Sequence, residues 1–248
     1  MGMNWKRHSF FYSIALVIIT VLLYSVCLDG EFHFDDLRRI VENPAIRDLK
    51  NFWPPYKGRY LVDLTFAINY QIGGLNTIGF HLVNVLIHII NVFLVRTLIL
   101  KLLGRDLPEA DFIAFTGALI FGIHPLQTQA VSYIVQRYAS MATMFYLLAM
   151  LAYIKWREGK GWPWYGLCLL SLIVGMHSKE IVFSAPFVIV VLEFVFFIFC
   201  DRRSFLFLLP VLFTAAIIPL ERFLPLLTGH HGTLRPPVVS EEGVYIPR

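Results

Sequence analysis

The sequence predicts an all-α protein whose helices form a polytopic transmembrane bundle. Its composition is 57% hydrophobic with a mean hydropathy of +0.66, and only 15% of its residues are charged. Most of these charges fall between long apolar stretches. A stretch of about 20 apolar residues matches the thickness of the hydrocarbon core of a bilayer. We therefore expect a single domain embedded in a lipid bilayer.

Seven segments are apolar enough to be expected as membrane spans. The apolar stretch 109–154 is too long for one helix, and because Pro125 interrupts its polar middle, we divide it into two. The expected spans are 9–28, 78–101, 108–124, 134–155, 164–177, 181–200 and 204–220. Residues 29–77 are expected to form a structured first external loop. The membrane domain should occupy residues 1–228, followed by an irregular, truncated tail over 229–248.

The distribution of Lys and Arg predicts the orientation, because cytoplasmic loops carry an excess of these residues. With a cytoplasmic N-terminus, the short external loops hold only two cations, Arg137 and Lys179. Most of the Lys and Arg residues outside the first external loop then lie on the cytoplasmic side. The first external loop also holds several Lys and Arg residues. We leave it out of this comparison because it holds many carboxylates as well and is expected to be folded. We therefore expect its polar residues on the external side.

Polar residues from three separate external loops are expected to meet at one membrane face. A lipid environment tolerates few idle charges, so such a cluster is a candidate functional site. Its principal members are Asp35, Asp36, Arg59, His81, His124, Gln127, Gln136, Arg137, Lys179 and Glu180. No metal-ligand set is readable in this cluster, although a divalent cation near the aspartates stays open.

Adjacent Asp35 and Asp36 suit a single general base better than a pair of catalytic carboxylates. A glycosidase pair needs carboxyl groups about 5–10 Å apart on opposite sides of a sugar. One carboxylate is enough to deprotonate an acceptor hydroxyl. Sugar transfer from a lipid phosphate fits this arrangement, because the departing phosphate needs positive charge rather than a proton. Arg59, Arg137 and Lys179 are the available cations.

Structural roles compete with these chemical ones. Asp36 could instead cap a short helix that begins at Leu37. The second span carries a polar stripe, made of His81, Asn84, His88 and Asn91. Its two histidines stand more than about 10 Å apart along the helix axis, too far to bind one zinc ion. Interhelical hydrogen bonding is the default role of this stripe.

The order of several motifs resembles the N-terminal membrane part of a known family. The motifs are Phe34-Asp35-Asp36, Ile40-Val41-Glu42-Asn43-Pro44, Phe80-His81-Leu82-Val83-Asn84, His124-Pro125-Leu126-Gln127-Thr128-Gln129, Gln136-Arg137 and Ser178-Lys179-Glu180. They are similar to those of the transmembrane-and-tetratricopeptide-repeat (TMTC-like) O-mannosyltransferases and their bacterial relatives, which have the GT-C fold. The likeness covers roughly residues 9–200.

This resemblance implies a GT-C-like membrane glycosyltransferase. It implies inverting transfer from a polyprenyl-phosphate-linked sugar to a hydroxyl of a protein or glycan acceptor, with Asp35 or Asp36 as the base. The closer likeness to bacterial members implies the inner membrane, with the active face in the periplasm. The chain shows no 34-residue repeat, so we expect it to be the N-terminal membrane portion of such a protein.

Two other classes of function stay open from the sequence. A multi-pass transporter or lipid-handling protein is one, and a non-catalytic assembly subunit of the membrane is the other. A transporter predicts polar residues along the full depth of several spans, whereas here they gather at one face. The net charge of +4 is too weak and too dispersed to indicate a nucleic-acid partner.

Overall fold

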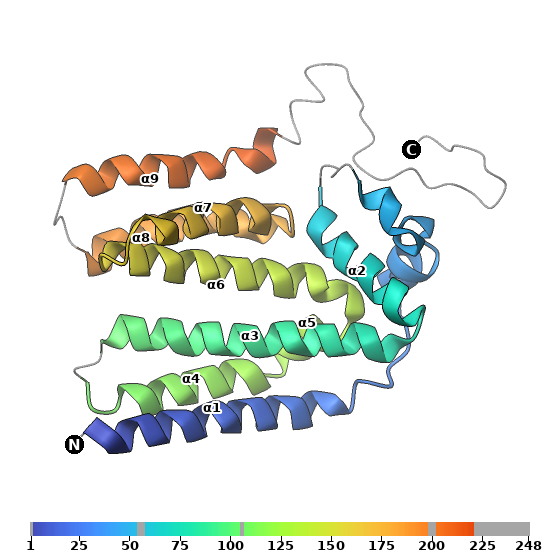
Figure 1. Cartoon of the computed structure of the whole chain (residues 1–248), viewed down its shortest axis with the longest axis horizontal. Coiled ribbons are helices and arrows are strands. Elements are labelled where there is room, and N and C mark those ends of the chain that lie inside the picture. The colour runs from blue at the N-terminus through green and yellow to red at the C-terminus, as the bar shows by residue number, and fades with distance from the viewer. Residues whose placement is uncertain (1, 54–57, 105–106, 198–201, 221–248) are drawn as a thin grey trace.

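A computed structural model describes residues 2–53, 58–104, 107–197 and 202–220, and the described residues form helices without strands. The all-α prediction is confirmed. Most of the helices run back and forth side by side (Figure 1). The α-helices are α1 (Gly2–Ser25), α2 (Tyr60–Gly73), α3 (Thr77–Leu103), α4 (Ala110–Ile123), α5 (Leu126–Ser132), α6 (Arg137–Arg157), α7 (Trp162–Met176), α8 (Ala185–Phe196) and α9 (Arg202–Thr214). The predicted tail over 229–248 lies outside the described residues.

Three of the described helices are long and apolar enough to cross a membrane. They are His8–Ser25, Thr77–Leu103 and Ile134–Arg157. The pair α4 and α5, bent by 65° at the predicted break near Pro125, would make a fourth as one broken span. Each of the seven predicted segments contains a helix, but length and composition support three to four crossings among the described residues. These helices are consistent with a membrane protein.

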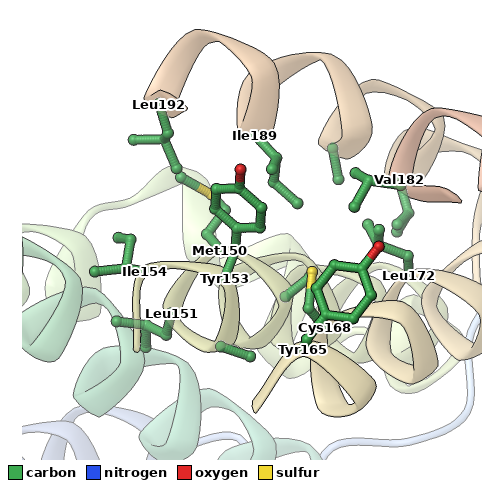
Figure 2. Close-up of a cluster of buried hydrophobic side chains, with 14 of the residues drawn as sticks. Met150, Leu151, Tyr153, Ile154, Tyr165, Cys168, Leu172, Val182, Ile189 and Leu192 are labelled. Carbon is green, nitrogen blue, oxygen red and sulfur yellow. The ribbon is translucent and has the colours of Figure 1, made fainter. Parts of the chain in front are cut away.

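A large apolar core joins α6, α7, α8 and α9. Tyr153, Cys168, Leu172 and Ile189 are almost completely buried in it. Figure 2 shows their side chains pointing into the space between the helices. Close packing of this kind fixes the relative positions of the helices, and therefore of the loops at their ends.

The first external loop is more regular than its sequence suggested. It contains three short helical turns, η1 (Leu37–Val41), η2 (Pro44–Arg47) and η3 (Leu49–Phe52), ahead of α2. Ile40, Ile46 and Phe52 are buried in one apolar cluster with Phe66 of α2, while Trp53 is 80% exposed. Some apolar residues of this segment therefore pack into a core with α2, whereas others face the surface.

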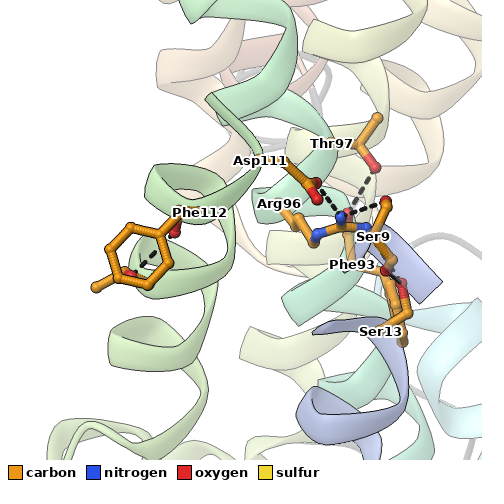
Figure 3. A network of polar contacts seen from close by, with 8 residues as sticks. Ser9, Ser13, Phe93, Arg96, Thr97, Asp111 and Phe112 are labelled. Atoms are coloured by element: carbon orange, nitrogen blue, oxygen red, sulfur yellow. Dashed lines mark hydrogen bonds and ion pairs between the residues drawn. The ribbon is translucent and has the colours of Figure 1, made fainter. Parts of the chain in front are cut away.

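The three segments predicted to be external gather at one end of the bundle, on the right of Figure 1. These are the segment between α1 and α2, the α4–α6 connection around α5, and the segment between α7 and α8. At the opposite end, Arg96 of α3 forms an ion pair with Asp111 of α4 and donates to Ser9 and Ser13 of α1 (Figure 3). The predicted gathering of these three segments at one end of the bundle is confirmed, and the external side of that end stays a prediction.

Candidate functional site

A polar pocket of about 150 Å³ lies where the external loops meet. Its walls come from the first external loop, the α5–α6 connection and the α7–α8 connection. It is lined by Asp35, Arg39, Arg59, Tyr133, Val135, Gln136, Tyr138 and Lys179. The structure thus brings together four of the residues that the sequence singled out, with three cations around one carboxylate.

The two aspartates of this loop have different surroundings. Asp36 is 1% exposed, and its carboxylate accepts hydrogen bonds from the backbone N–H groups of Val135 (2.7 Å) and His33 (3.1 Å). Asp35 is exposed and lines the pocket. Asp36 therefore joins the first external loop to the turn that precedes α6, whereas Asp35 lines the pocket.

The interpretation of Asp36 as a helix cap is wrong. Asp36 directly precedes η1, but its side chain makes no capping hydrogen bond there. Its carboxylate oxygens instead accept hydrogen bonds from the backbone N–H groups of Val135 and His33. The bond from Val135 joins two loops that are far apart in the sequence. Burial raises the pKa of the Asp36 carboxyl, although the two backbone N–H groups act in the opposite direction.

An unusual backbone conformation at Phe34 precedes the pair. Phe34 has a φ of 46°, in the left-handed region that a residue with a side chain adopts at a cost of roughly 1–2 kcal/mol. Its ring stands edge-on to Tyr133, whose hydroxyl accepts a 2.9 Å hydrogen bond from the backbone N–H of Asp35. These contacts hold the tight turn that sends Asp35 and Asp36 to different partners.

Arg59 stands at the start of α2 and contacts two sides of the site. Its guanidinium forms an ion pair with Glu180, with Nη2 3.0 Å from Oε2, and lies 5.0 Å from the centre of the Tyr138 ring. The Arg59 and Glu180 side chains are 35% and 43% exposed, so the pair is weak and open to exchange. Glu180 thus contacts a pocket cation that comes from a distant part of the chain.

Lys179 and Arg39 supply the other two cations. Lys179 donates a 3.2 Å hydrogen bond to the side-chain oxygen of Gln136. Burial lowers the pKa of the Lys179 ammonium, and the nearby charge of Arg59 lowers it further. Arg39 lines the pocket from η1, and the sequence analysis missed it. Its position four residues after Asp35 is the spacing of one helical face, which could have pointed to it.

Arg137 does not line the pocket, contrary to its expected role as a contact for the donor phosphate. Its side chain is completely buried between α2, α3 and α6. The guanidinium donates to the side-chain oxygens of Asn84 and Asn69 at 2.7 Å each, and to the carbonyl of Phe80 at 2.9 Å. The sequence could not distinguish this buried, helix-joining role from anion binding, because a cation at the start of a span suits both.

The remaining candidates also lie off the pocket lining. His81 is buried, with Nε2 3.2 Å from the carbonyl oxygen of Gly30. His124 is exposed at the end of α4, where its Nδ1 accepts a hydrogen bond from the backbone N–H of Leu126. Gln127 belongs to α5 and is half-buried. The structure therefore brings Asp35, Arg59, Gln136 and Lys179 into one pocket, but not these three.

The polar stripe on α3 makes the interhelical hydrogen bonds that were its default role. Asn84 donates to the carbonyls of Val131 and Ile134, and Asn91 donates to the carbonyl of Ser140. His88 Nε2 lies 3.0 Å from the carbonyl oxygen of Gly122. Within the described ranges, no group of three or more His, Cys, Asp and Glu side chains could hold a metal ion.

The fold and the pocket define a class: a helical protein of membrane type with a cation-rich pocket around one carboxylate at a single end. Comparison with known proteins adds a set of similar sequences. No family model matches the chain, and no solved structure matches it.

The relatives share one description. The chain is 33% identical over 162 residues to "Protein O-mannosyl-transferase F38B6.6" of Caenorhabditis elegans, covering 58% of this chain and 23% of that protein. It is 34% identical over 170 residues to the human "Protein O-mannosyl-transferase TMTC2" (59% and 20%). It is 32% identical over 187 residues to "Protein O-mannosyl-transferase Tmtc1" of Drosophila melanogaster (67% and 21%).

These similarities support assigning the chain to the TMTC-like family. The chain spans about a fifth of the length of the curated relatives that it matches.

Proposed function

We propose that this chain is the N-terminal membrane portion of a GT-C-type glycosyltransferase. It would transfer a sugar from a polyprenyl-phosphate-linked donor to a hydroxyl of a protein or glycan acceptor, as in protein O-mannosylation. The observation that carries the proposal is the pocket itself, in which Asp35 shares one small space with Arg39, Arg59 and Lys179. The names of the relatives favour a glycosyltransferase.

In the proposed reaction, Asp35 is the general base. Its carboxylate accepts the proton of the acceptor hydroxyl while the hydroxyl oxygen bonds to the anomeric carbon of the sugar. The bond from that carbon to the phosphate oxygen breaks, and its electron pair leaves with the polyprenyl phosphate. Arg39, Arg59 and Lys179 stabilise the added negative charge on that phosphate. A single displacement inverts the anomeric configuration.

The proposed setting is a bacterial inner membrane, with the pocket on the periplasmic face and residues 1–228 forming the membrane domain. A polyprenyl chain lies in the bilayer, so a headgroup pocket at the end of a helical bundle suits such a donor. The polar groups along α3 donate to backbone carbonyls of neighbouring segments. These contacts favour a structural role for the asparagines of α3 over a transport path. A divalent cation that accompanies the donor is compatible with Asp35.

Two matched substitutions test the proposal. The full chain and its Asp35→Asn and Asp36→Asn variants would be purified in detergent and assayed with polyprenyl-phosphate mannose and a Ser/Thr-containing peptide. Loss of a general base costs roughly 100- to 10,000-fold in turnover, so Asp35→Asn should lose at least about 100-fold. Binding of farnesyl phosphate, a soluble stand-in for the donor, should survive this change.

Asp36→Asn is the control, because it keeps a side-chain oxygen that can accept from Val135. It should reduce turnover far less than Asp35→Asn. Equal turnover of the wild-type chain and Asp35→Asn would contradict the assignment of Asp35. A wild-type chain that binds no farnesyl phosphate would contradict the donor class.

A further inference from the structure

We infer that Arg137 is a positioning residue that sets the placement of Arg59 and Tyr138 in the pocket. The inference rests on the proposed function, because it concerns how the phosphate-binding wall of that pocket is held. Arg137 itself does not touch the pocket. It acts through the helices that it joins.

The contacts of Arg137 are directional and involve all three nitrogens of its guanidinium. Nε donates to Asn84 of α3, Nη2 donates to the carbonyl of Phe80 in α3, and Nη1 donates to Asn69 of α2. A further 3.0 Å hydrogen bond runs from Nη1 to Thr65 of α2. A buried charge needs hydrogen-bond partners of this kind, so the position of the guanidinium is strongly constrained.

On the α2 side, these contacts determine where Arg59 stands. Thr65 and Asn69 belong to α2, and Arg59 immediately precedes that helix. The carbonyl of Arg59 accepts the backbone N–H groups of Val62 and Asp63, so its backbone is continuous with the first turn. A shift of α2 relative to α6 would therefore carry the Arg59 guanidinium with it.

On the α6 side, the residues next to Arg137 line the pocket. Gln136 and Tyr138 are both in its wall. The Tyr138 hydroxyl donates to Asp63 of α2, and the Tyr138 ring lies under the Arg59 guanidinium. One buried side chain thus fixes the α2–α6 contact at which Arg59 and Tyr138 meet.

An arginine is needed here because of its shape. The guanidinium is a rigid planar fork whose three nitrogens reach Asn84, Asn69 and the carbonyl of Phe80 in different directions. It also lies 4.5 Å from the centre of the Phe66 ring of α2. A lysine keeps the charge but has one compact ammonium, which cannot reproduce that set of contacts.

The test is a double-mutant cycle on the full chain in detergent, with the dissociation constant of farnesyl phosphate as its readout. Arg137→Lys should weaken binding about fivefold or more, within the usual size of couplings between residues that share partners. In an Arg59→Ala background, the same change should weaken binding less than about twofold, because the cation that it displaces is gone. A merely structural role would lower the melting temperature and give additive effects.

Arg96→Lys is the matched control. Arg96 is also a buried arginine that joins helices (Figure 3), but it lies near the C-terminal end of α3, towards the opposite end of the bundle. It should lower the melting temperature without changing the binding of farnesyl phosphate. If Arg137→Lys does not fold, Asn69→Ala removes one acceptor on α2 and should show the same dependence on Arg59.

The outcomes separate the two proposals. Additive effects of Arg137→Lys and Arg59→Ala, or an equal loss of binding in Arg96→Lys, would overturn the role of Arg137 alone. Unchanged binding in Arg59→Ala would overturn the phosphate role of Arg59 in the proposed function, and the inference with it. Loss of the Arg137 effect in the Arg59→Ala background supports both.

Discussion

Two neighbouring aspartates divide two tasks in this protein. Asp36 binds backbone N–H groups and joins two loops, while Asp35 stays open to the pocket. The sequence identified the pair but could not assign the roles, because the partner of Asp36 is the N–H group of Val135, 99 residues away. The same limit applies to Arg137, whose acceptors come from helices that only the fold brings together.

At this scale, the raised pKa of Asp36 predicts a pH dependence of stability. Below the ordinary carboxyl pKa of about 4, residue 36 is protonated in both the native and the unfolded chain. As the pH rises through the raised native pKa, the unfolded chain ionises more readily, so the free energy of unfolding falls. The Asp36→Asn variant has no such group.

Thermal unfolding in detergent between pH 4 and 7 measures this effect. The stability of the wild-type chain relative to Asp36→Asn should decrease as the pH rises. A stability difference that stays constant, or that grows in favour of the wild-type chain, would show that ionisation of Asp36 does not destabilise the fold.

At the scale of the elements, the sequence predicted the apolar helices but did not predict α2. Each predicted span contains a helix, and the bend between α4 and α5 falls at the predicted break around Pro125. The signals for α2 were present, since Val62 and Phe66 are four residues apart on its buried face and Gly74 ends it with a φ of 60°. The sequence analysis missed these helix signals because it interpreted residues 29–77 from their charged residues.

Two ion pairs that join elements should differ in their contribution to stability. Arg96 and Asp111 join α3 to α4, with side chains that are 9% and 19% exposed, whereas Lys101 and Glu158 pair at 26% and 31% exposure. Asp111→Asn leaves a buried arginine without its counter-charge and should lower the free energy of unfolding by about 3 kcal/mol. Glu158→Gln should lower it by less than about 1 kcal/mol.

Chemical or thermal unfolding of both variants in the same detergent gives the comparison. The salt dependence provides a second check, because screening weakens the exposed pair more than the buried one. Equal losses in the two variants would mean that Arg96 finds other partners when Asp111 is neutral.

For the whole molecule, the sequence predicted that the polar loops meet at one end, and the structure places them there (Figure 1). Their membrane side is a prediction from the distribution of Lys and Arg. What the sequence could not predict is which loop residues face one another across the pocket, because that depends on the register of α2, α6 and the segment before α8.

Labelling of single cysteines tests the orientation. In a chain whose native cysteines, Cys27, Cys168 and Cys200, are replaced by alanine, Leu126→Cys and Lys160→Cys place a thiol at each end of the bundle. Both positions are exposed. A membrane-impermeant maleimide added to intact cells or sealed right-side-out vesicles should label position 126 and leave 160 unlabelled until the membrane is opened. The reverse pattern would place the pocket in the cytoplasm.

The Arg59–Glu180 pair joins residues that are 121 positions apart, and Lys179 is the last pocket residue along the chain. During synthesis, Asp35 is therefore inserted long before its full set of basic neighbours has left the ribosome. A nascent chain arrested before residue 179 would carry Asp35 without the complete set of pocket cations. Under the proposed function, the ability to bind a donor would thus arise late in biogenesis, when the connection after α7 folds back on the first loop.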